Sequence, residues 1–231
     1  MYEYEIIFIW EKKMVNVNAI DEIKNYLKPT DTLVCVSKKQ DIEAIMSAYE
    51  LGIRDFGENI VSEFINKYEK LPKDIKWHFV GHLQSNKVKY IIGKTFLIHS
   101  LDRVSLLNEL EGYSKKLKIE TNALIQVNIS KEPQKGGVFL EDIDALLEDI
   151  EKCKHIKVKG LMSIGSTELE KSKEEFIVLK LKWDEIKKNE YNNIKMEYLS
   201  MGMSDDFKIA LECGSNMIRV GTYIFGSRNN V

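Results

Sequence analysis

The sequence contains few of the residues that cross-link small secreted proteins or separate domains. Its three cysteines, at positions 35, 153 and 213, are far apart and form no Cys-x-x-Cys pair. An odd number of scattered cysteines argues against a disulfide framework and fits a reducing compartment, so we expect a cytoplasmic protein. With only three prolines and no low-complexity tract, the chain shows no interdomain linker.

Two further absences limit the possible partners. The 34 basic and 36 acidic side chains give a net charge of -2, so there is no basic excess of the kind that nucleic-acid binding requires. No apolar run is long enough to span a membrane. We therefore expect neither nucleic acid nor membrane as a partner, and we expect a monomer.

The first thirteen residues form a segment of uncertain status. Residues 1–13 contain a short apolar run that acidic residues precede, without a basic region or a cleavage site. We interpret this segment as a non-secretory extension. The alternatives are an extra strand, or a true start at Met14.

What the chain does contain is an alternation of short apolar runs and helical patterns. Several runs are apolar on both faces, as strands of a parallel sheet covered on both sides should be. Eight such strands are expected, at residues 32–37, 52–57, 77–81, 96–100, 123–129, 158–165, 196–202 and 217–221.

Amphipathic helices are expected between these strands. Apolar residues recur at helical spacing in 41–51, 139–153 and 173–188, and shorter helices are expected at 18–27 and 205–213. Asp102 is placed to cap a further helix, which carries Leu106, Leu107 and Leu110.

Eight strands that alternate with helices leave two architectures, a doubly wound open sheet and a (β/α)8 barrel. The glycine fingerprint of dinucleotide folds, Gly-x-Gly-x-x-Gly, does not follow the first strand. The count of eight favours a single TIM-type barrel, an α/β fold, over residues 14–231.

In such barrels the active site lies at the carboxyl ends of the strands. Lys38 follows the first strand, and partial burial beside other cations would favour the neutral amine that a Schiff base requires. Lys39 is a direct rival, and either lysine could simply be solvated. Strand alternation places Lys38 on the face of Val34 and Val36, and Lys39 on the opposite face.

The last two strands end in a second candidate constellation. Ser204 precedes a short helix and Gly221-Thr222 follows the eighth strand, where TIM barrels commonly bind phosphate through backbone N–H groups. Both could instead have local roles, as a helix cap and a turn. Arg219 lies within a strand, where a charge needs either a ligand or a carboxylate partner.

A metal site is not indicated. His78 and His82 could share a strand face, but the four histidines are scattered and no third ligand can be named. The lysine-rich helices are expected to be solvated faces.

Several segments resemble those of the pyridoxal phosphate (PLP) homeostasis proteins. The similarity runs in order from about Val34 to Arg228, and its most specific parts are GHLQSNK (81–87) and the C-terminal LSMGMSDD and IRVGTYIFG segments; further matching segments are VCVSKK (34–39), FGENIVSEF (56–64) and VKGLMSIGS (158–166). That family is similar to the N-terminal barrel of alanine racemase.

The resemblance implies PLP as cofactor, bound as an internal aldimine to Lys38. It also implies phosphate contacts from Ser204, Gly221 and Thr222, a position for Arg219 facing the pyridine nitrogen, and Asn59 lining the pocket. The continuation Lys39-Gln40-Asp41 departs from the family pattern.

The implied role is to bind PLP reversibly in vitamin B6, amino-acid and keto-acid homeostasis, without established catalytic turnover and with PLP-dependent apoenzymes as possible recipients. The alternatives are an amino-acid racemase and a Schiff-base aldolase that uses Lys38 without cofactor. We expect no efficient racemase, because the chain ends at Val231 without the second domain that supplies the opposite base in alanine racemase. Tyr223 should face the helices.

Overall fold

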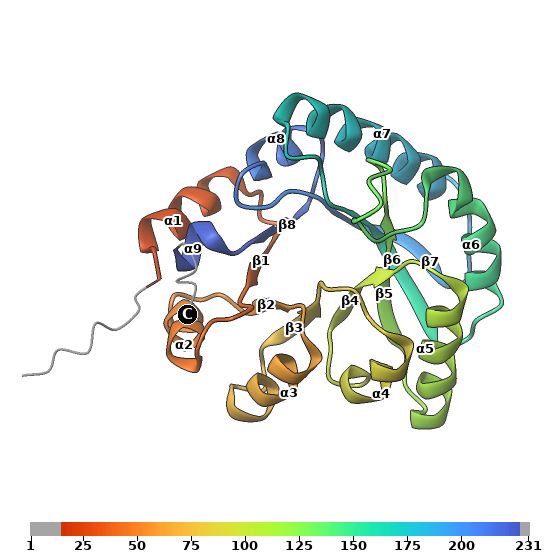
Figure 1. The fold of residues 1–231 in the computed structure, drawn as a ribbon, viewed down its shortest axis with the longest axis horizontal. Helices are drawn as coiled ribbons and strands as arrows, with labels where there is room; N and C mark the ends of the chain where they lie inside the picture. The colour runs from red at the N-terminus through yellow and green to blue at the C-terminus, as the bar shows by residue number, and fades with distance from the viewer. Residues whose placement is uncertain (1–14, 227–231) are drawn as a thin grey trace, which may run out of the picture.

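The computed structural model describes residues 15–226, and its strands close into one parallel barrel (Figure 1). The eight strands pair in sequence order, and β1 also pairs with β8, so the open-sheet alternative is excluded. All eight expected strands are present: β1 Thr32–Val36, β2 Asp55–Glu58, β3 Lys76–Phe79, β4 Leu97–Leu101, β5 Thr121–Val127, β6 Ile156–Ser163, β7 Ile194–Ser200 and β8 Met217–Val220.

The helices surround this barrel. They are α1 Val17–Tyr26, α2 Ile42–Glu50, α3 Val61–Lys70, α4 Val88–Ile91, α5 Val104–Leu117, α6 Ile143–Glu151, α7 Leu169–Lys187, α8 Phe207–Glu212 and α9 Thr222–Phe225, with 3-10 turns η1 Ser85–Lys87 and η2 Leu140–Asp142. The six expected helices are present close to their expected positions, whereas α3, α4 and α9 were not predicted. Asp41 caps α2 by accepting a hydrogen bond from the backbone N–H of Ala44 at 2.8 Å.

The predicted cap of α5 is wrong. Its N-cap residue is Arg103, and no side chain bonds the first turn of the helix. The Asp102 carboxylate instead accepts a hydrogen bond from the Arg103 guanidinium at 2.5 Å, and it lies 3.7 Å from His82. A cation binds a carboxylate more strongly than a neutral backbone N–H does, which explains why Asp102 pairs with Arg103 and does not cap the helix.

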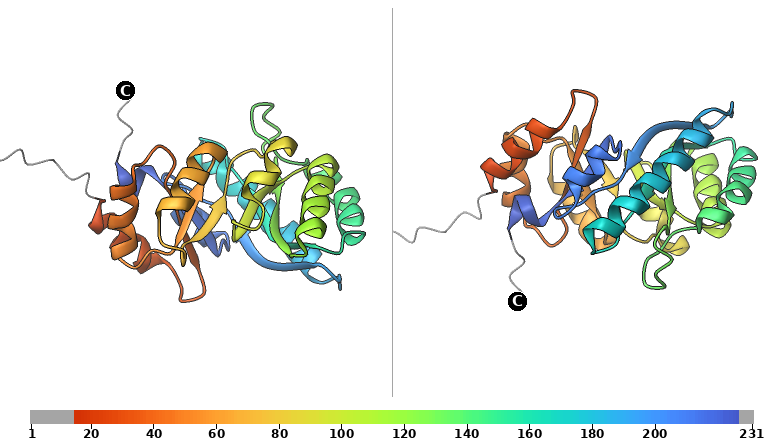
Figure 2. Two further views of the ribbon diagram at one scale, coloured as in Figure 1. Left: turned by 90° about the horizontal axis from the view of Figure 1, so that it is seen from below. Right: turned by 90° about the horizontal axis from the view of Figure 1, so that it is seen from above.

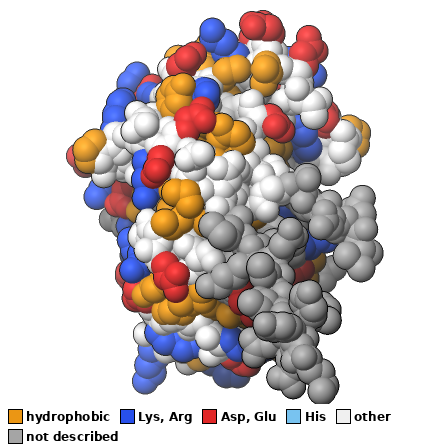
Figure 3. Space-filling model, turned by 90° about the vertical axis from the view of Figure 1, so that its left-hand side faces the viewer, with side chains coloured by type: hydrophobic (Ala, Val, Ile, Leu, Met, Phe, Trp, Pro, Cys, Tyr) orange, Lys and Arg blue, Asp and Glu red, His pale blue; other side chains and the backbone are white. Residues whose placement is uncertain are grey.

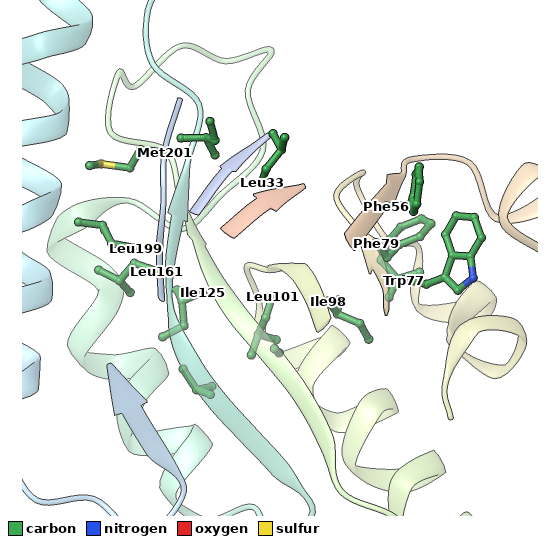
Figure 4. Close-up of a cluster of buried hydrophobic side chains, with 14 of the residues drawn as sticks. Leu33, Phe56, Trp77, Phe79, Ile98, Leu101, Ile125, Leu161, Leu199 and Met201 are labelled. Carbon is green, nitrogen blue, oxygen red and sulfur yellow. The ribbon is translucent and has the colours of Figure 1, made fainter. Parts of the chain in front are cut away.

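The main hydrophobic core lies between the strands and the helices. Figure 4 shows part of it, where Phe56, Trp77 and Phe79 point outward from neighbouring strands. The Trp77 ring is 5.8 Å from Phe64 of α3 and 6.1 Å from Phe56, which fixes the helix against the sheet. A much smaller apolar cluster fills the barrel interior; it consists of Val34, Leu97, Leu124, Met162 and Met217.

The first and last described helices meet. The backbone N–H of Asn16 donates to the carbonyl of Ile224 at 2.8 Å, and Lys208 pairs with Glu22 at 2.7 Å. In Figure 3, the side of the molecule near α1 and α2 carries charges of both signs interspersed with hydrophobic side chains. The predictions for residues 1–13 and for Met14 lie outside the described residues.

Candidate cofactor site at the carboxyl ends of the strands

Lys38 and Lys39 lie in the turn that follows β1, and they differ in exposure. Val34 and Val36 both contact the position of Gly57, and Lys38 is half-buried. Lys39 is exposed and has φ +61°, and its backbone N–H donates to Glu63 at 2.7 Å. The backbone therefore directs Lys39 toward the surface beside α3.

A buried ion pair holds the backbone next to Lys38. Lys67 of α3, only 4% exposed, donates to the carbonyl of Ser37 at 2.8 Å and to Glu58 at 2.8 Å. The hydroxyl of Ser37 donates to the same Glu58 oxygen at 2.6 Å. Burial raises the pKa of Glu58, while Lys67 opposes that rise. The backbone at Ser37, directly before Lys38, is thus held in place by a lysine of α3 on the outside of the barrel.

Sequence reasoning missed Lys67, because a lysine on an amphipathic helix is usually solvated. The available signal was its spacing. Lys67 lies three residues after Phe64, which is fully buried, and so belongs to the inner stripe of α3.

Ser204 brings together the connections that follow β7 and β8. Its hydroxyl oxygen lies 3.4 Å from the Gly221 nitrogen, 3.3 Å from the Tyr223 nitrogen and 2.9 Å from the Thr222 hydroxyl. Ser204 is not a helix cap, since Asp206 occupies the N-cap position of α8. The three predicted phosphate contacts therefore lie together, with two backbone N–H groups directed to one point.

Gly221 is packed too tightly to carry a side chain. A Cβ atom at this position would lie 3.0 Å from the carbonyl oxygen of Val36 in β1. The end of β8 consequently approaches the strand that carries Lys38, two residues further along. The structure brings the Gly221 segment and the Lys38 segment to the same part of the barrel mouth.

Asn59 directly follows β2, two residues after Gly57. Its side-chain oxygen is buried and has no hydrogen-bond partner among the described residues. Gly81 packs directly on it, because a Cβ at that position would lie 2.4 Å from the carbonyl oxygen of Asn59. Asn59 also borders a cavity of about 440 Å³ between β2, α3 and α4. A buried amide oxygen without a partner is a candidate ligand contact.

Arg219 is a buried cation inside the barrel, 5% exposed. Its guanidinium donates to the Ser200 hydroxyl at 2.6 Å and to the Ser163 carbonyl at 2.8 Å. Among the described residues it forms no ion pair with a carboxylate, which was one of the two alternatives for this residue. Burial lowers the pKa of Arg219 to about 10, and the charge of Asp206 opposes this. Arg219 remains a cation at neutral pH.

His78 and His82 lie in different environments. His82 has a side chain that is 59% exposed, whereas His78 is fully buried inside the barrel, 2.9 Å from His99. Within residues 15–226 no group of three His, Cys, Asp or Glu side chains is placed to hold a metal ion. In the same residues no helix is long and apolar enough to cross a membrane.

Tyr223 faces the helices, as predicted, because its hydroxyl bonds to Glu22 of α1 and its ring packs against Phe207 of α8.

Figure 2 shows the connection between β5 and α6 standing out from the barrel. Within it, Lys135 donates to Glu132 at 2.7 Å and to the carbonyl of Gly165 at 2.9 Å, which ties this connection to the segment after β6.

A closed parallel barrel of eight strands surrounded by helices is the fold of the alanine racemase N-terminal domain. The alanine racemase N-terminal domain family matches residues 17–229. Alanine racemase of Clostridium difficile 630 superposes with a TM-score of 0.72 at 13% identity, covering 94% of this chain and 59% of that one, which shows the fold.

Closer relatives identify the family. The pyridoxal phosphate homeostasis protein of Aquifex aeolicus is 43% identical over 199 residues, 85% of this chain and 86% of that protein, and the one of Schizosaccharomyces pombe is 38% identical over 202 residues, 85% and 84% of the two chains. PipY of Synechococcus elongatus, whose structure is known without and with PLP, superposes with TM-scores of 0.85 and 0.82 at 31% identity, covering 90% of this chain and 99% of that one. The chain belongs to the family of pyridoxal phosphate homeostasis proteins.

Proposed function

We propose that this protein binds PLP through a covalent bond to Lys38 and acts in intracellular PLP homeostasis as a carrier without efficient turnover. The observation that supports the proposal is the Ser204–Gly221 cluster beside Val36, two residues before Lys38, in a chain of this family; Asn59 follows β2 and Arg219 lies in β8, the two strands that pair with β1. PLP supplies an aldehyde that combines with amines and a ring that can accept electrons.

The residues at the mouth fit the parts of PLP. Two backbone N–H groups and the hydroxyls of Ser204 and Thr222 suit a phosphate, which takes several donors. Gly221 lets the backbone approach that phosphate closely, and the unpartnered oxygen of Asn59 suits a polar group on the ring. Lys38, two residues after Val36, supplies the amine.

The charge of Arg219 favours a protein that binds PLP over an enzyme that converts substrates with it. A permanent cation beside the pyridine nitrogen disfavours protonation of that nitrogen, since a second positive charge nearby is unfavourable. A ring kept neutral in this way accepts electrons poorly, so carbanion chemistry is slow. The residues then bind and orient the cofactor and can release it to PLP-dependent apoenzymes. We place this role in the cytoplasm, where the unpaired thiols of Cys35, Cys153 and Cys213 are stable, and we propose a monomer.

A PLP titration of the purified protein, followed by visible absorbance, tests the binding. We expect saturable binding at one PLP per chain in the wild type and in Lys39→Ala, and loss of the covalent absorbance band in Lys38→Ala. Because Lys39 is adjacent and exposed, Lys39→Ala is a matched control for charge and for folding. A band that persists in Lys38→Ala would exclude the assignment.

An assay with L-alanine in deuterium oxide tests the absence of turnover. We expect Cα exchange and D-alanine formation well below the ordinary enzymatic range. Turnover on the order of 1 per second or faster would overturn the carrier role and favour the racemase.

A further inference from the structure

A hydrogen-bonded chain of side chains crosses the barrel interior from Arg219 to Asp55. Arg219 Nη1 lies 2.6 Å from Ser200 Oγ, which is 3.4 Å from His99 Nδ1. His99 Nε2 lies 2.9 Å from His78 Nδ1, and His78 Nε2 lies 3.0 Å from Asp55 Oδ1. The five residues come from β8, β7, β4, β3 and β2, which Figure 1 shows around the barrel.

The two ends of the chain fix the direction of every hydrogen bond in it. A guanidinium only donates, and a carboxylate only accepts. Ser200 must therefore accept from Arg219 and donate to His99, and each histidine must accept at Nδ1 and donate from Nε2. The opposite tautomers would set a lone pair of His78 against the carboxylate of Asp55, and they would leave the hydroxyl proton of Ser200 without an acceptor among these five residues. One arrangement alone satisfies all five groups.

Burial keeps both histidines neutral, as this arrangement requires. Burial lowers the pKa of His99 well below its usual value, with further contributions from His78 and Arg219. Burial also lowers the pKa of His78, although the hydrogen bond to Asp55 opposes this. The charged or titratable groups that face the chain from the surrounding elements are Lys76 beside His78, Tyr198 near Asp55, and Asp206 near Arg219.

These hydrogen-bonded side chains also link the positive charge of Arg219 to the negative charge of Asp55. Among the described residues no carboxylate lies within ion-pair distance of Arg219, so its charge is balanced at longer range. Asp55 stands at the start of β2 with a side chain that is 19% exposed, so the far end of the chain touches solvent. The interior thus connects the cofactor end of the barrel to its opposite end.

We propose that Asp55, His78, His99 and Ser200 form a positioning relay that orients Arg219 and sets the charge that bound PLP experiences. This inference rests on the function proposed above. The four residues act through Arg219 and do not touch the cofactor. Asp55 is the residue that fixes the polarity, because only an obligate acceptor at that end forces both tautomers. A neutral amide at position 55 can donate as well as accept, which releases the constraint and removes one negative charge.

The first test uses the protein without PLP. In wild-type protein labelled with nitrogen-15 on histidine, long-range NMR correlations should show His78 and His99 as neutral rings protonated at Nε2 alone. This measurement needs no variant to fold. A mixture of tautomers, or protonation of His99 at Nδ1, would overturn the relay whether or not PLP binds.

The second test compares Asp55→Asn with a matched control. Glu111→Gln breaks the carboxylate–histidine pair with His155 (2.8 Å) on the outside of the barrel, and it should change neither the signals of His78 and His99 nor the bound cofactor. Asp55→Asn should give mixed tautomers. It should also lower the pH midpoint of the absorbance change of bound PLP by a fraction of a unit to about one unit, as expected for one charge removed at an effective dielectric constant of about 20.

The outcomes separate the relay from the proposed function. The expected tautomers in a protein that takes up no PLP would overturn the proposed function alone. PLP uptake by a protein with mixed wild-type tautomers would overturn the relay alone. The expected tautomers with an unchanged midpoint in Asp55→Asn would show that the chain is structural and does not act on the cofactor.

Discussion

On the outer face of the barrel sheet, the side chains that contact the helices are large and apolar, as Phe56, Trp77 and Phe79 show. The inner face carries few apolar residues, and its centre holds the polar chain from Arg219 to Asp55. A buried apolar side chain stabilises a fold directly, whereas a buried charge must first be compensated. The outer face therefore accounts for stability, and the inner face gives up some stability to build a binding site.

The largest expected effect concerns the outer face. Trp77→Ala removes a side chain that is 2% exposed and in contact with Phe64, so it should lower the free energy of unfolding by about 3–5 kcal/mol. PLP affinity per folded molecule should not change, because Trp77 points away from the mouth. Urea unfolding and a PLP titration measure the two quantities.

Leu181→Ala is the control for this prediction, since the Leu181 side chain of α7 is 64% exposed. It should change stability by no more than about 0.5 kcal/mol. A Trp77→Ala protein that is as stable as Leu181→Ala would remove the assignment of stability to the outer face.

A smaller effect is expected at the barrel mouth, where a substitution should change PLP affinity more than it changes the stability of the fold. Gly221→Val places a branched side chain against the carbonyl oxygen of Val36, which cannot move without β1. Overpacking of this kind costs about 1–3 kcal/mol, so PLP affinity should fall by about fivefold to about 150-fold. Gly112→Ala, in α5 where an added Cβ meets nothing within 4 Å, controls for the loss of a glycine. Unaltered PLP affinity in Gly221→Val would exclude this phosphate position.

The smallest expected effect is the change with pH in the free energy of unfolding of the protein without PLP. Burial lowers the pKa of His78 and of His99 below the ordinary 6.5, so below that pH the unfolded chain binds protons that the folded chain does not. The stabilisation is complete above about pH 6.5 and is lost as the pH falls toward the folded pKa values, by at most about 1.4 kcal/mol per unit for each histidine.

Urea unfolding at several values between about pH 7.5 and 5.5 measures this loss. His99→Gln should reduce the slope, because one of the two titrating groups is gone. Stability that does not change with pH over this range would show that the inner histidines are not held neutral.

The sequence predicted the outer face better than the inner one. Each strand could be found because its outward residues are apolar along the chain. The cluster of Ser204 with Gly221 and Thr222 was also predictable, because barrel topology brings the ends of the last two strands together.

The inner network was not predictable in the same way. His78 and His99 are 21 residues apart, and only the register of β3 against β4 makes them neighbours. The role of Lys67 could not be predicted, because its partners, Glu58 and the carbonyl of Ser37, are contributed by strand ends. Asp102 was assigned to a helix cap because the competing guanidinium of Arg103 could not be placed from sequence.

The most direct test of the central claim is borohydride reduction of the PLP-loaded protein followed by peptide mapping. We expect one pyridoxyl group per chain, on Lys38, because this lysine is half-buried and lies two residues after Val36, which Gly221 approaches, whereas Lys39 is exposed. A label on Lys39, or one distributed over surface lysines, would contradict it.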